Sequence, residues 1–174
     1  MYELLRKSFL EGPVVERNGY AYFVNPVSDG VPVTDPALLE EVVEGLIGLC
    51  RFDCDLILAP EAMGIPLAVG ISLRTGIPYS VIRKRRYGIP GELEIVRDTG
   101  YSHDCIYING VRKGDRVAIV DDTLSTGGTM RAVTSKLISQ GVEVTEVAVV
   151  FDKTRDLSAA VPGIDVKALL KVGI

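Results

Sequence analysis

The stretch Val-Ala-Ile-Val-Asp-Asp-Thr-Leu-Ser-Thr-Gly-Gly-Thr, residues 117–129, decides the fold class of this chain. Its first four residues are apolar, as in a strand that is buried on both faces of a parallel sheet. We expect this strand to end at the carboxylates Asp121 and Asp122. A hydroxyl- and glycine-rich turn follows at 123–129, and then a helix over 128–140 with apolar residues on one face.

A buried strand, an acidic pair and a turn at a helix N-terminus together predict a binding site for a sugar phosphate. The carboxylates of Asp121 and Asp122 can accept hydrogen bonds from vicinal hydroxyls. Backbone N–H groups at a helix N-terminus can hold a phosphate, and Gly127 and Gly128 allow its close approach. An acidic pair or a Gly-Gly turn alone would be weak evidence, but here the parts occur together and in order.

Strands and helices alternate along the rest of the chain. The segment 84–104 lacks periodicity and contains several glycines, so we expect a long loop or a loosely held hairpin there. The alternation predicts a doubly wound α/β fold with the ligand site at the carboxyl ends of the strands. The predicted helices cover 2–11, 36–50, 65–74 and 128–140, and the predicted strands cover 20–24, 55–59, 79–83, 105–108, 117–121 and 144–151.

Length and composition exclude several classes of protein. A chain of 174 residues, 47% hydrophobic and 24% charged, forms one globular domain with a sizeable core. Its net charge of −4 and pI near 5.1 argue against a nucleic-acid partner. No apolar run approaches the ~20 residues that span a bilayer, and the N-terminus does not have the pattern of a signal peptide. The three cysteines lack metal-site spacing, which favours buried thiols in a cytoplasmic protein.

The stretch 117–129 resembles the signature of the type I phosphoribosyltransferases, which bind 5-phosphoribosyl-1-pyrophosphate (PRPP). The resemblance extends over nearly the whole chain and is closest to the archaeal hypoxanthine/guanine phosphoribosyltransferases. It implies that Asp121 and Asp122 bind the ribose hydroxyls and that the following turn cradles the 5′-phosphate. The remaining PRPP-binding residues that it implies in this turn are Thr123, Ser125, Thr126, Gly127, Gly128 and Thr129.

The resemblance also implies a division of the single domain. A small N-terminal hood of about 1–34 would close on the base, above a core of about 35–174 with a mostly parallel sheet flanked by helices. The segment 84–104 would be a mobile loop like that of the adenine phosphoribosyltransferases, which closes over the site and excludes water. A homodimer is expected.

Two further segments are candidates for binding pyrophosphate. In the similar enzymes, a loop of backbone amides, often with a non-proline cis peptide, binds this group. The resemblance places that loop at Glu61, Ala62, Met63 and Gly64, which again follow a predicted strand and open a helix. The cationic run 83–86 can be a solvated surface or a clamp on a leaving group of high negative charge. We expect Arg83 and Lys84 to contact pyrophosphate, in this subunit or across a dimer.

Base recognition is expected at the end of the strand 144–151. In phosphoribosyltransferases for 6-oxopurines, a lysine at the position of Lys153 hydrogen-bonds the purine O6. An ammonium group only donates hydrogen bonds, so it should favour a carbonyl oxygen over the amine of adenine. In the hood, Asn25 would contact a ring edge, and Val27 or Phe23 would pack on the ring face.

The implied function is purine salvage, in which hypoxanthine or guanine and PRPP give IMP or GMP and pyrophosphate. Mg²⁺ would arrive bound mainly to PRPP, without a metal site of the protein's own. The eukaryotic-type enzymes have an aspartate that acts on purine N7 where this chain has Ser125, so the general acid/base stays open among Glu92, Glu94 and Asp104. The alternatives are an adenine phosphoribosyltransferase and a non-catalytic regulator of the same fold that binds PRPP or nucleotides.

Overall fold

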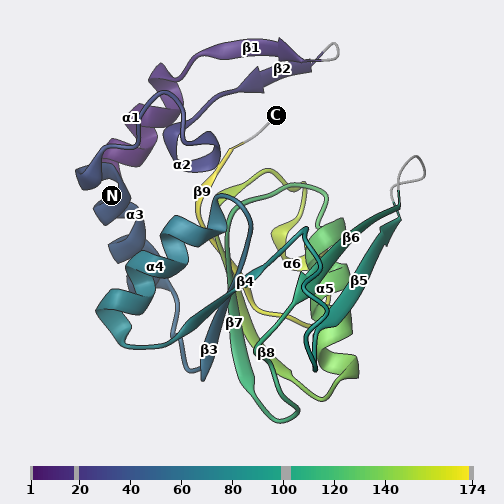
Figure 1. Cartoon of the computed structure of the whole chain (residues 1–174). Helices are drawn as coiled ribbons and strands as arrows, with labels where there is room; N and C mark the ends of the chain where they lie inside the picture. Colours follow the sequence, from purple (N-terminus) through teal and green to yellow (C-terminus); the bar gives the residue numbers. More distant parts are fainter. Residues whose placement is uncertain (1, 18–19, 99–102, 173–174) are drawn as a thin grey trace.

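A five-stranded, fully parallel sheet forms the centre of the molecule in the computed structural model (Figure 1). The structure describes residues 2–17, 20–98 and 103–172, so parts of the predicted hood and mobile loop lie outside the described residues. The strands, in their order across the sheet, are β4 (Tyr79–Ile82), β3 (Leu56–Pro60), β7 (Arg116–Leu124), β8 (Glu143–Asp152) and β9 (Val166–Lys171).

Helices cover both faces of this sheet, which confirms the predicted α/β architecture. Alternate residues of β7 belong to two separate cores: Ala118 and Val120 pack with the side chains of α3 and α4, whereas Val117 and Ile119 pack with those of α5. A two-stranded antiparallel hairpin, β5–β6, lies beside α5 (Figure 1). The bounds of these elements are α3 Pro36–Leu49, α4 Gly64–Thr75, α5 Gly128–Ser139, β5 Leu93–Asp98 and β6 His103–Ile108.

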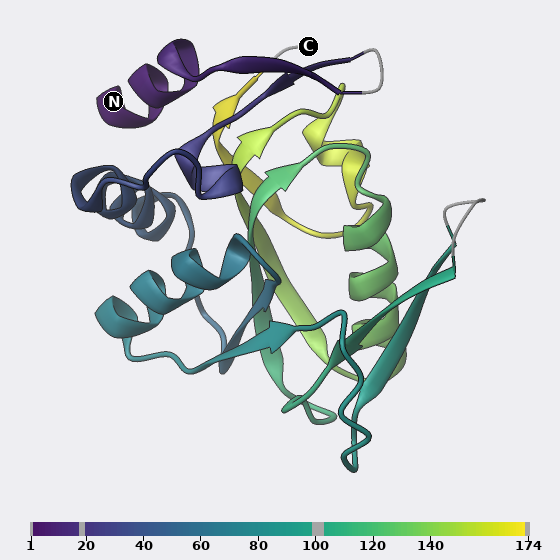
Figure 2. The ribbon, with the colours of Figure 1, turned by 45° about the horizontal axis from the view of Figure 1, so that its top comes forward.

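The hood lies across one end of the sheet (Figure 2). Its helix α1 is anchored by Leu5, which is fully buried in the core next to α3. The ring of Phe9 lies 4.4 Å from that of Phe23 in the hood and 6.0 Å from that of Phe151 in β8, measured between ring centroids. The hood consists of α1 (Glu3–Glu11), β1 (Val14–Arg17), β2 (Tyr20–Phe23) and α2 (Pro26–Asp29), and α6 (Leu157–Ala160) follows β8.

The principal strand differs from the prediction at its end. It was expected to stop at the acidic pair, but β7 continues to Leu124. Pairing with β3 ends at Ile119, whereas pairing with β8 continues through Asp121 to Leu124. The prediction was wrong because apolar patterning ends where a strand leaves the core, while the hydrogen bonds of its neighbour can carry it further.

The other difference concerns short or edge elements. Strands β1 and β9 were not predicted, and β1 has no alternation to reveal it, because Val14 and Val15 are both exposed. Of the two alternatives for the segment 84–104, the hairpin is the one observed: β5 lies inside the segment and β6 begins in it and continues to Ile108, and Ile95 and Ile106 are buried on the α5 side of the core. No helix in the described ranges is long and apolar enough to cross a membrane.

Candidate active site

The acidic pair lies where the hood, α4 and the end of β7 meet. The first residue of α4, Gly64, packs so closely on β7 that an added Cβ would lie 2.7 Å from the carbonyl oxygen of Val120 and 3.3 Å from Oδ1 of Asp121. A glycine is therefore required for the helix to approach the carboxylates. The backbone N–H of Asp122 donates to Oδ1 of Asp121 over 2.9 Å, which fixes the orientation of that side chain.

Both carboxylates are in an environment that disfavours their charge. Burial raises the pKa of Asp121 well above its ordinary value, and the charge of Asp122 raises it further. Burial is also the main cause that raises the pKa of Asp122, and the hood residue Asp29 adds to it. Within the described ranges, no lysine or arginine forms an ion pair with either group. Donors supplied by a ligand, such as the hydroxyls of a ribose, would stabilise the charged form.

The turn after β7 forms one wall of a hollow of about 220 Å³. Gly127 has a φ of +75°, and an added Cβ would collide with the carbonyl oxygen of Ala160, so both the conformation and the space require glycine. The hydroxyl of Thr123 is buried, and its interaction with the Asp122 carboxylate counteracts part of the rise in the pKa of that group. The hollow is lined by Pro60, Glu61, Lys84, Asp121, Thr123, Leu124, Ser125, Thr126, Gly127, Gly128, Thr129 and Met130.

The predicted pyrophosphate loop lies opposite this turn, and its Glu61–Ala62 peptide is cis, as the resemblance implied. The Glu61 carboxylate accepts hydrogen bonds from the backbone N–H of Lys84 over 2.9 Å and from Nη1 of Arg83 over 3.1 Å. The bond from Lys84 is the main cause that holds the pKa of Glu61 below its ordinary value. The side chain of Glu61 therefore holds the cationic run in place, and the backbone of Ala62, Met63 and Gly64 is the part of the loop suited to an anion.

Lys153 lies at the carboxyl end of β8 and faces the hood. Its backbone N–H donates to the carbonyl oxygen of Leu124 over 2.8 Å, and its Nζ lies 5.8 Å from the centroid of the Tyr22 ring. The hydroxyl of Tyr22 donates to Oδ1 of Asp29 over 2.6 Å. Lys153 also lines a second hollow of about 490 Å³, which adjoins residues 125–129 at Ser125; we call these residues the phosphate turn because they are predicted to bind the 5′-phosphate.

The two hood residues assigned to the base have structural roles here. Asn25 and Val27 are buried, with 1% and 3% of their surface exposed. Oδ1 of Asn25 accepts from the Val27 N–H over 2.8 Å and caps α2, and its Nδ2 donates to Oγ of Ser8 over 3.1 Å. Contact with a base would require these bonds to change, so both assignments stay predictions. Phe23 stacks on Phe9.

The candidates for a general acid/base lie away from the acidic pair. Glu92 accepts hydrogen bonds from the N–H groups of Tyr87 and Gly88 and from Nδ2 of Asn109, so it organises the turn before β5. Oε1 of Glu94 accepts a weak bond from the Cys105 thiol over 3.7 Å. Neither of them lines the two hollows, and neither does Asp104. The general acid/base stays open.

Arg131 is a residue of this site that the sequence analysis missed. Its Nη1 donates to the carbonyl oxygens of Thr126 and Ala160, and so joins the phosphate turn to α6. The signal was available, because Arg131 lies one helical turn after Gly127 and so on the side of α5 next to that glycine.

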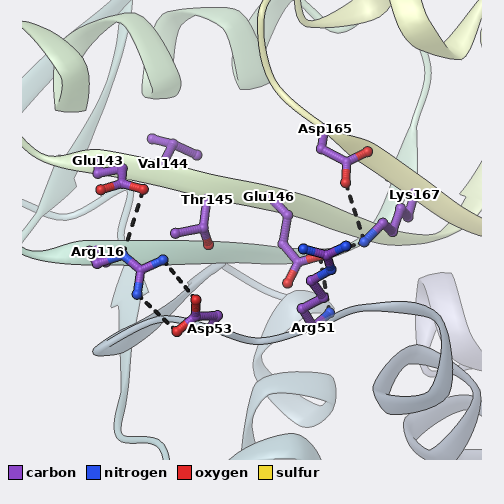
Figure 3. A pocket seen from close by; sticks show the side chains of 9 residues that line it. All are labelled: Arg51, Asp53, Arg116, Glu143, Val144, Thr145, Glu146, Asp165 and Lys167. Carbon is purple, nitrogen blue, oxygen red and sulfur yellow. Dashed lines mark hydrogen bonds and ion pairs between the residues drawn. The ribbon is translucent and has the colours of Figure 1, made fainter.

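A different polar cluster occupies the amino end of the sheet (Figure 3). At its surface, Arg116 makes a bidentate pair with Asp53, with N–O distances of 2.8 and 3.0 Å, and reaches Glu143 over 3.6 Å. The pair with Asp53 is the main cause that raises the pKa of Arg116. The charges of Arg116, Asp53 and Glu143 are thus paired with one another within the protein.

The buried part of this cluster is centred on Glu146, which is 3% exposed. Its Oε1 accepts from the Phe52 N–H over 2.7 Å, and its Oε2 lies 3.0 Å from Nζ of Lys167. Burial and then the Glu146 charge raise the pKa of the neighbouring Cys50 thiol to about 12. Cys50 is thus an unreactive thiol, and Glu146 stabilises the loop that leads into β3.

Comparison with known proteins agrees with this geometry. The Phosphoribosyl transferase domain family matches residues 35–161. The hypoxanthine/guanine phosphoribosyltransferase of Methanohalophilus mahii is 46% identical over 175 residues, which is 100% of this chain and 92% of the relative. The same enzyme of Methanothermobacter thermautotrophicus is 47% identical over 176 residues, or 100% of this chain and 91% of the relative.

Solved structures show the same fold. The adenine phosphoribosyltransferase of Thermoanaerobacter pseudethanolicus superposes with a TM-score of 0.82 at 28% identity, covering 99% of this chain and 100% of the other. That of Rhodothermus marinus superposes with a TM-score of 0.76 at 22% identity and covers 98% of each chain. The resemblance noted from residues 117–129 is confirmed over the full length, and the chain belongs to the phosphoribosyl transferase family.

Proposed function

We propose that this protein transfers the 5-phosphoribosyl group from PRPP to hypoxanthine or guanine, giving IMP or GMP and pyrophosphate. The observation that carries the proposal is the pair Asp121 and Asp122, whose charges lack a cationic partner in the described structure and which lie between two anion-suited backbone segments. A ribose with phosphates at both ends would supply hydroxyl donors to the pair and anions to the segments on either side.

Each part of the site has a distinct task in this proposal. Asp121 and Asp122 hold the ribose and favour the positive charge that develops at its C1 as the pyrophosphate leaves. The phosphate turn, residues 125–129, holds the 5′-phosphate through N–H groups at the start of α5. Lys84, which lines the hollow, and Arg83 offset the charge of the departing pyrophosphate.

Mg²⁺ is proposed to enter with PRPP. No group of three or more His, Cys, Asp or Glu side chains suited to a metal occurs among the described residues. The uncompensated carboxylates at the end of β7 nevertheless fit a cation that is carried by the substrate, because a positive charge nearby would offset their repulsion. When bound, the ion would neutralise charge on the pyrophosphate, and Asp121 and Asp122 would orient the ribose.

The preference for a 6-oxopurine rests on Lys153 and on the relatives of 46–47% identity, which are hypoxanthine/guanine phosphoribosyltransferases. An ammonium at the end of β8 can donate to a purine O6 and cannot accept from an adenine amine. The adenine phosphoribosyltransferase of Thermoanaerobacter pseudethanolicus has the same fold at 28% identity, however, which keeps adenine as the second candidate substrate.

The direct test is PRPP-dependent turnover with hypoxanthine, guanine, xanthine and adenine, each measured in parallel with Mg²⁺. We expect kcat/KM for hypoxanthine or guanine to exceed that for adenine. A preference for adenine would replace the proposal by its second candidate. No turnover with any base, together with PRPP-dependent binding to DNA in a gel shift, would favour the regulator.

A homodimer and a cytoplasmic location complete the proposal. Strand β4 is an edge of the sheet, and exposed apolar side chains lie on it and on the loop that follows it: Tyr79 is 41% exposed, Tyr87 53% and Ile89 52%. Such a surface beside Arg83 suits a second copy of the chain. Light scattering of the wild type and of Ile89→Lys tests this, because a dimer that uses this surface should dissociate in the variant.

A further inference from the structure

The side chain of Arg131 supports the phosphate turn through hydrogen bonds to backbone carbonyl groups. Nη1 of Arg131 donates to the carbonyl oxygen of Thr126 over 2.9 Å and to that of Ala160 over 2.7 Å. The backbone N–H of Arg131 in turn donates to the carbonyl oxygen of Gly127 over 2.8 Å, as part of the first turn of α5. Both carbonyls that flank the Gly127 N–H are therefore occupied by donors from the same residue.

This arrangement fixes the direction of an N–H group. The Thr126–Gly127 peptide is trans, and in a planar trans peptide the C=O and N–H bonds point in opposite directions. Arg131 lines the hollow that adjoins Lys153, whereas it does not line the hollow that contains Asp121. With the Thr126 carbonyl turned toward Arg131, the Gly127 N–H is directed to the opposite side, where the 5′-phosphate is proposed to bind.

We infer that Arg131 is a positioning residue, which presets the Gly127 N–H of the turn toward the 5′-phosphate by holding the Thr126 carbonyl away from it. The inference rests on the proposed function, because it takes residues 125–129 as the 5′-phosphate site. Without this bond, rotation of the same peptide would point a carbonyl oxygen at the phosphate, so that repulsion would replace a hydrogen bond.

The hydrogen bond from Arg131 to the Ala160 carbonyl oxygen connects the phosphate turn to a segment that is itself held in place. Ala160 ends α6, in the segment that begins at Lys153. The start of that segment is also held, because the carboxylate of Asp152 accepts from the N–H and the hydroxyl of Thr154 and lies 3.2 Å from Nζ of Lys171. Arg131 thus connects the phosphate turn to the segment 153–160, which begins with the proposed base contact Lys153.

The test measures dissociation constants for two probes by calorimetry, ribose 5-phosphate and pyrophosphate. In Arg131→Met, which keeps most of the apolar stem, binding of ribose 5-phosphate should weaken about tenfold or more, the scale of one hydrogen bond to a charged group. Pyrophosphate binding should change less than about twofold, because Arg131 has no contact with the loop at residues 61–64. The KM for PRPP should rise more than kcat falls. Arg112→Met, at an exposed site before β7, is the matched control and should behave as wild type.

A second variant separates positioning from charge. Arg131→Lys keeps the positive charge, but its side chain is shorter and cannot reach both carbonyls, so it should bind ribose 5-phosphate nearly as weakly as Arg131→Met. Wild-type affinity in Arg131→Lys would overturn the inference and assign the effect to charge alone. Equal losses for both probes would assign Arg131 to general stability and also overturn it. If the wild type itself fails to bind ribose 5-phosphate, the proposed function fails as well.

Discussion

The two ends of the central sheet both carry buried carboxylates, but in opposite electrostatic states. At the amino end, Glu146 has a lysine at 3.0 Å and a backbone N–H donor at 2.7 Å. At the carboxyl end, the pKa values of Asp121 and Asp122 are raised by burial and by neighbouring carboxylates. A carboxylate thus stabilises the fold at one end and is held in an unfavourable state at the other.

The difference shows how a structural polar cluster can be told from a binding site. The amino-end hollow, at about 480 Å³, is larger than the one beside the acidic pair, at about 220 Å³. The charges of its principal side chains are already paired inside the protein, as Figure 3 shows for Arg116 and Lys167. Unbalanced charge, rather than volume, marks the end of the sheet that needs a ligand.

The largest expected effect is on stability at the amino end. Glu146→Ala leaves the Phe52 N–H without its acceptor and Lys167 with Asp165 as its remaining partner, so it should lower the free energy of unfolding by about 3 kcal/mol. Urea denaturation measures this change. Glu143→Ala, on the same strand but exposed, is the control and should have a small effect. If the two variants lost equal amounts of unfolding free energy, the claim that the buried Glu146 carboxylate stabilises the fold would be contradicted.

The next effect is on activity at the carboxyl end. Asp122→Asn keeps the shape of the side chain but removes the charge that is proposed to accept hydrogen bonds from the ribose hydroxyls, so kcat/KM for PRPP should fall by an amount equivalent to about 2–3 kcal/mol of transition-state stabilisation. The folded structure should persist, as judged by circular dichroism. A correctly folded variant with wild-type kinetics would refute ribose binding by this residue.

A smaller effect is expected at the base. Lys153→Ala should lower kcat/KM for hypoxanthine and guanine by about 1.5–2 kcal/mol, more than tenfold, with little change in PRPP affinity. Any activity with adenine should fall less, because adenine has no O6 and therefore does not form this hydrogen bond in the wild type. Steady-state kinetics with each base at saturating PRPP measure the difference, with Lys7→Ala in the hood as the control. An equal fall for all bases would assign Lys153 to the structure of the turn.

Much of this contrast could be predicted from the sequence, and the reasons differ between residues. The core strand and the turn at 117–129 were predictable because apolar runs, acidic pairs and glycines have strong local preferences. The roles of Glu61 and Asn25 were not, because side-chain partners such as Arg83 and Ser8 lie 22 and 17 residues away in the chain. For Arg131, the position one helical turn after Gly127 was visible in the sequence, but the contact with Ala160, which spans 29 residues, was not.

The most direct test of the contrast is the stability of wild type and Asp121→Asn as a function of pH. A carboxyl whose pKa is raised on folding favours the folded state below its unfolded pKa of about 4, and this contribution is lost as the pH rises through the raised value. The amide introduced by Asp121→Asn has no such charge and can still accept the hydrogen bond from the Asp122 N–H. Urea denaturation from about pH 4 to about pH 8 should therefore show the variant gaining stability over wild type as the pH rises, and PRPP with Mg²⁺ should reduce that difference by stabilising wild type. A difference that is constant over this pH range would contradict the claim that the carboxyl end of the sheet holds an uncompensated charge for its ligand.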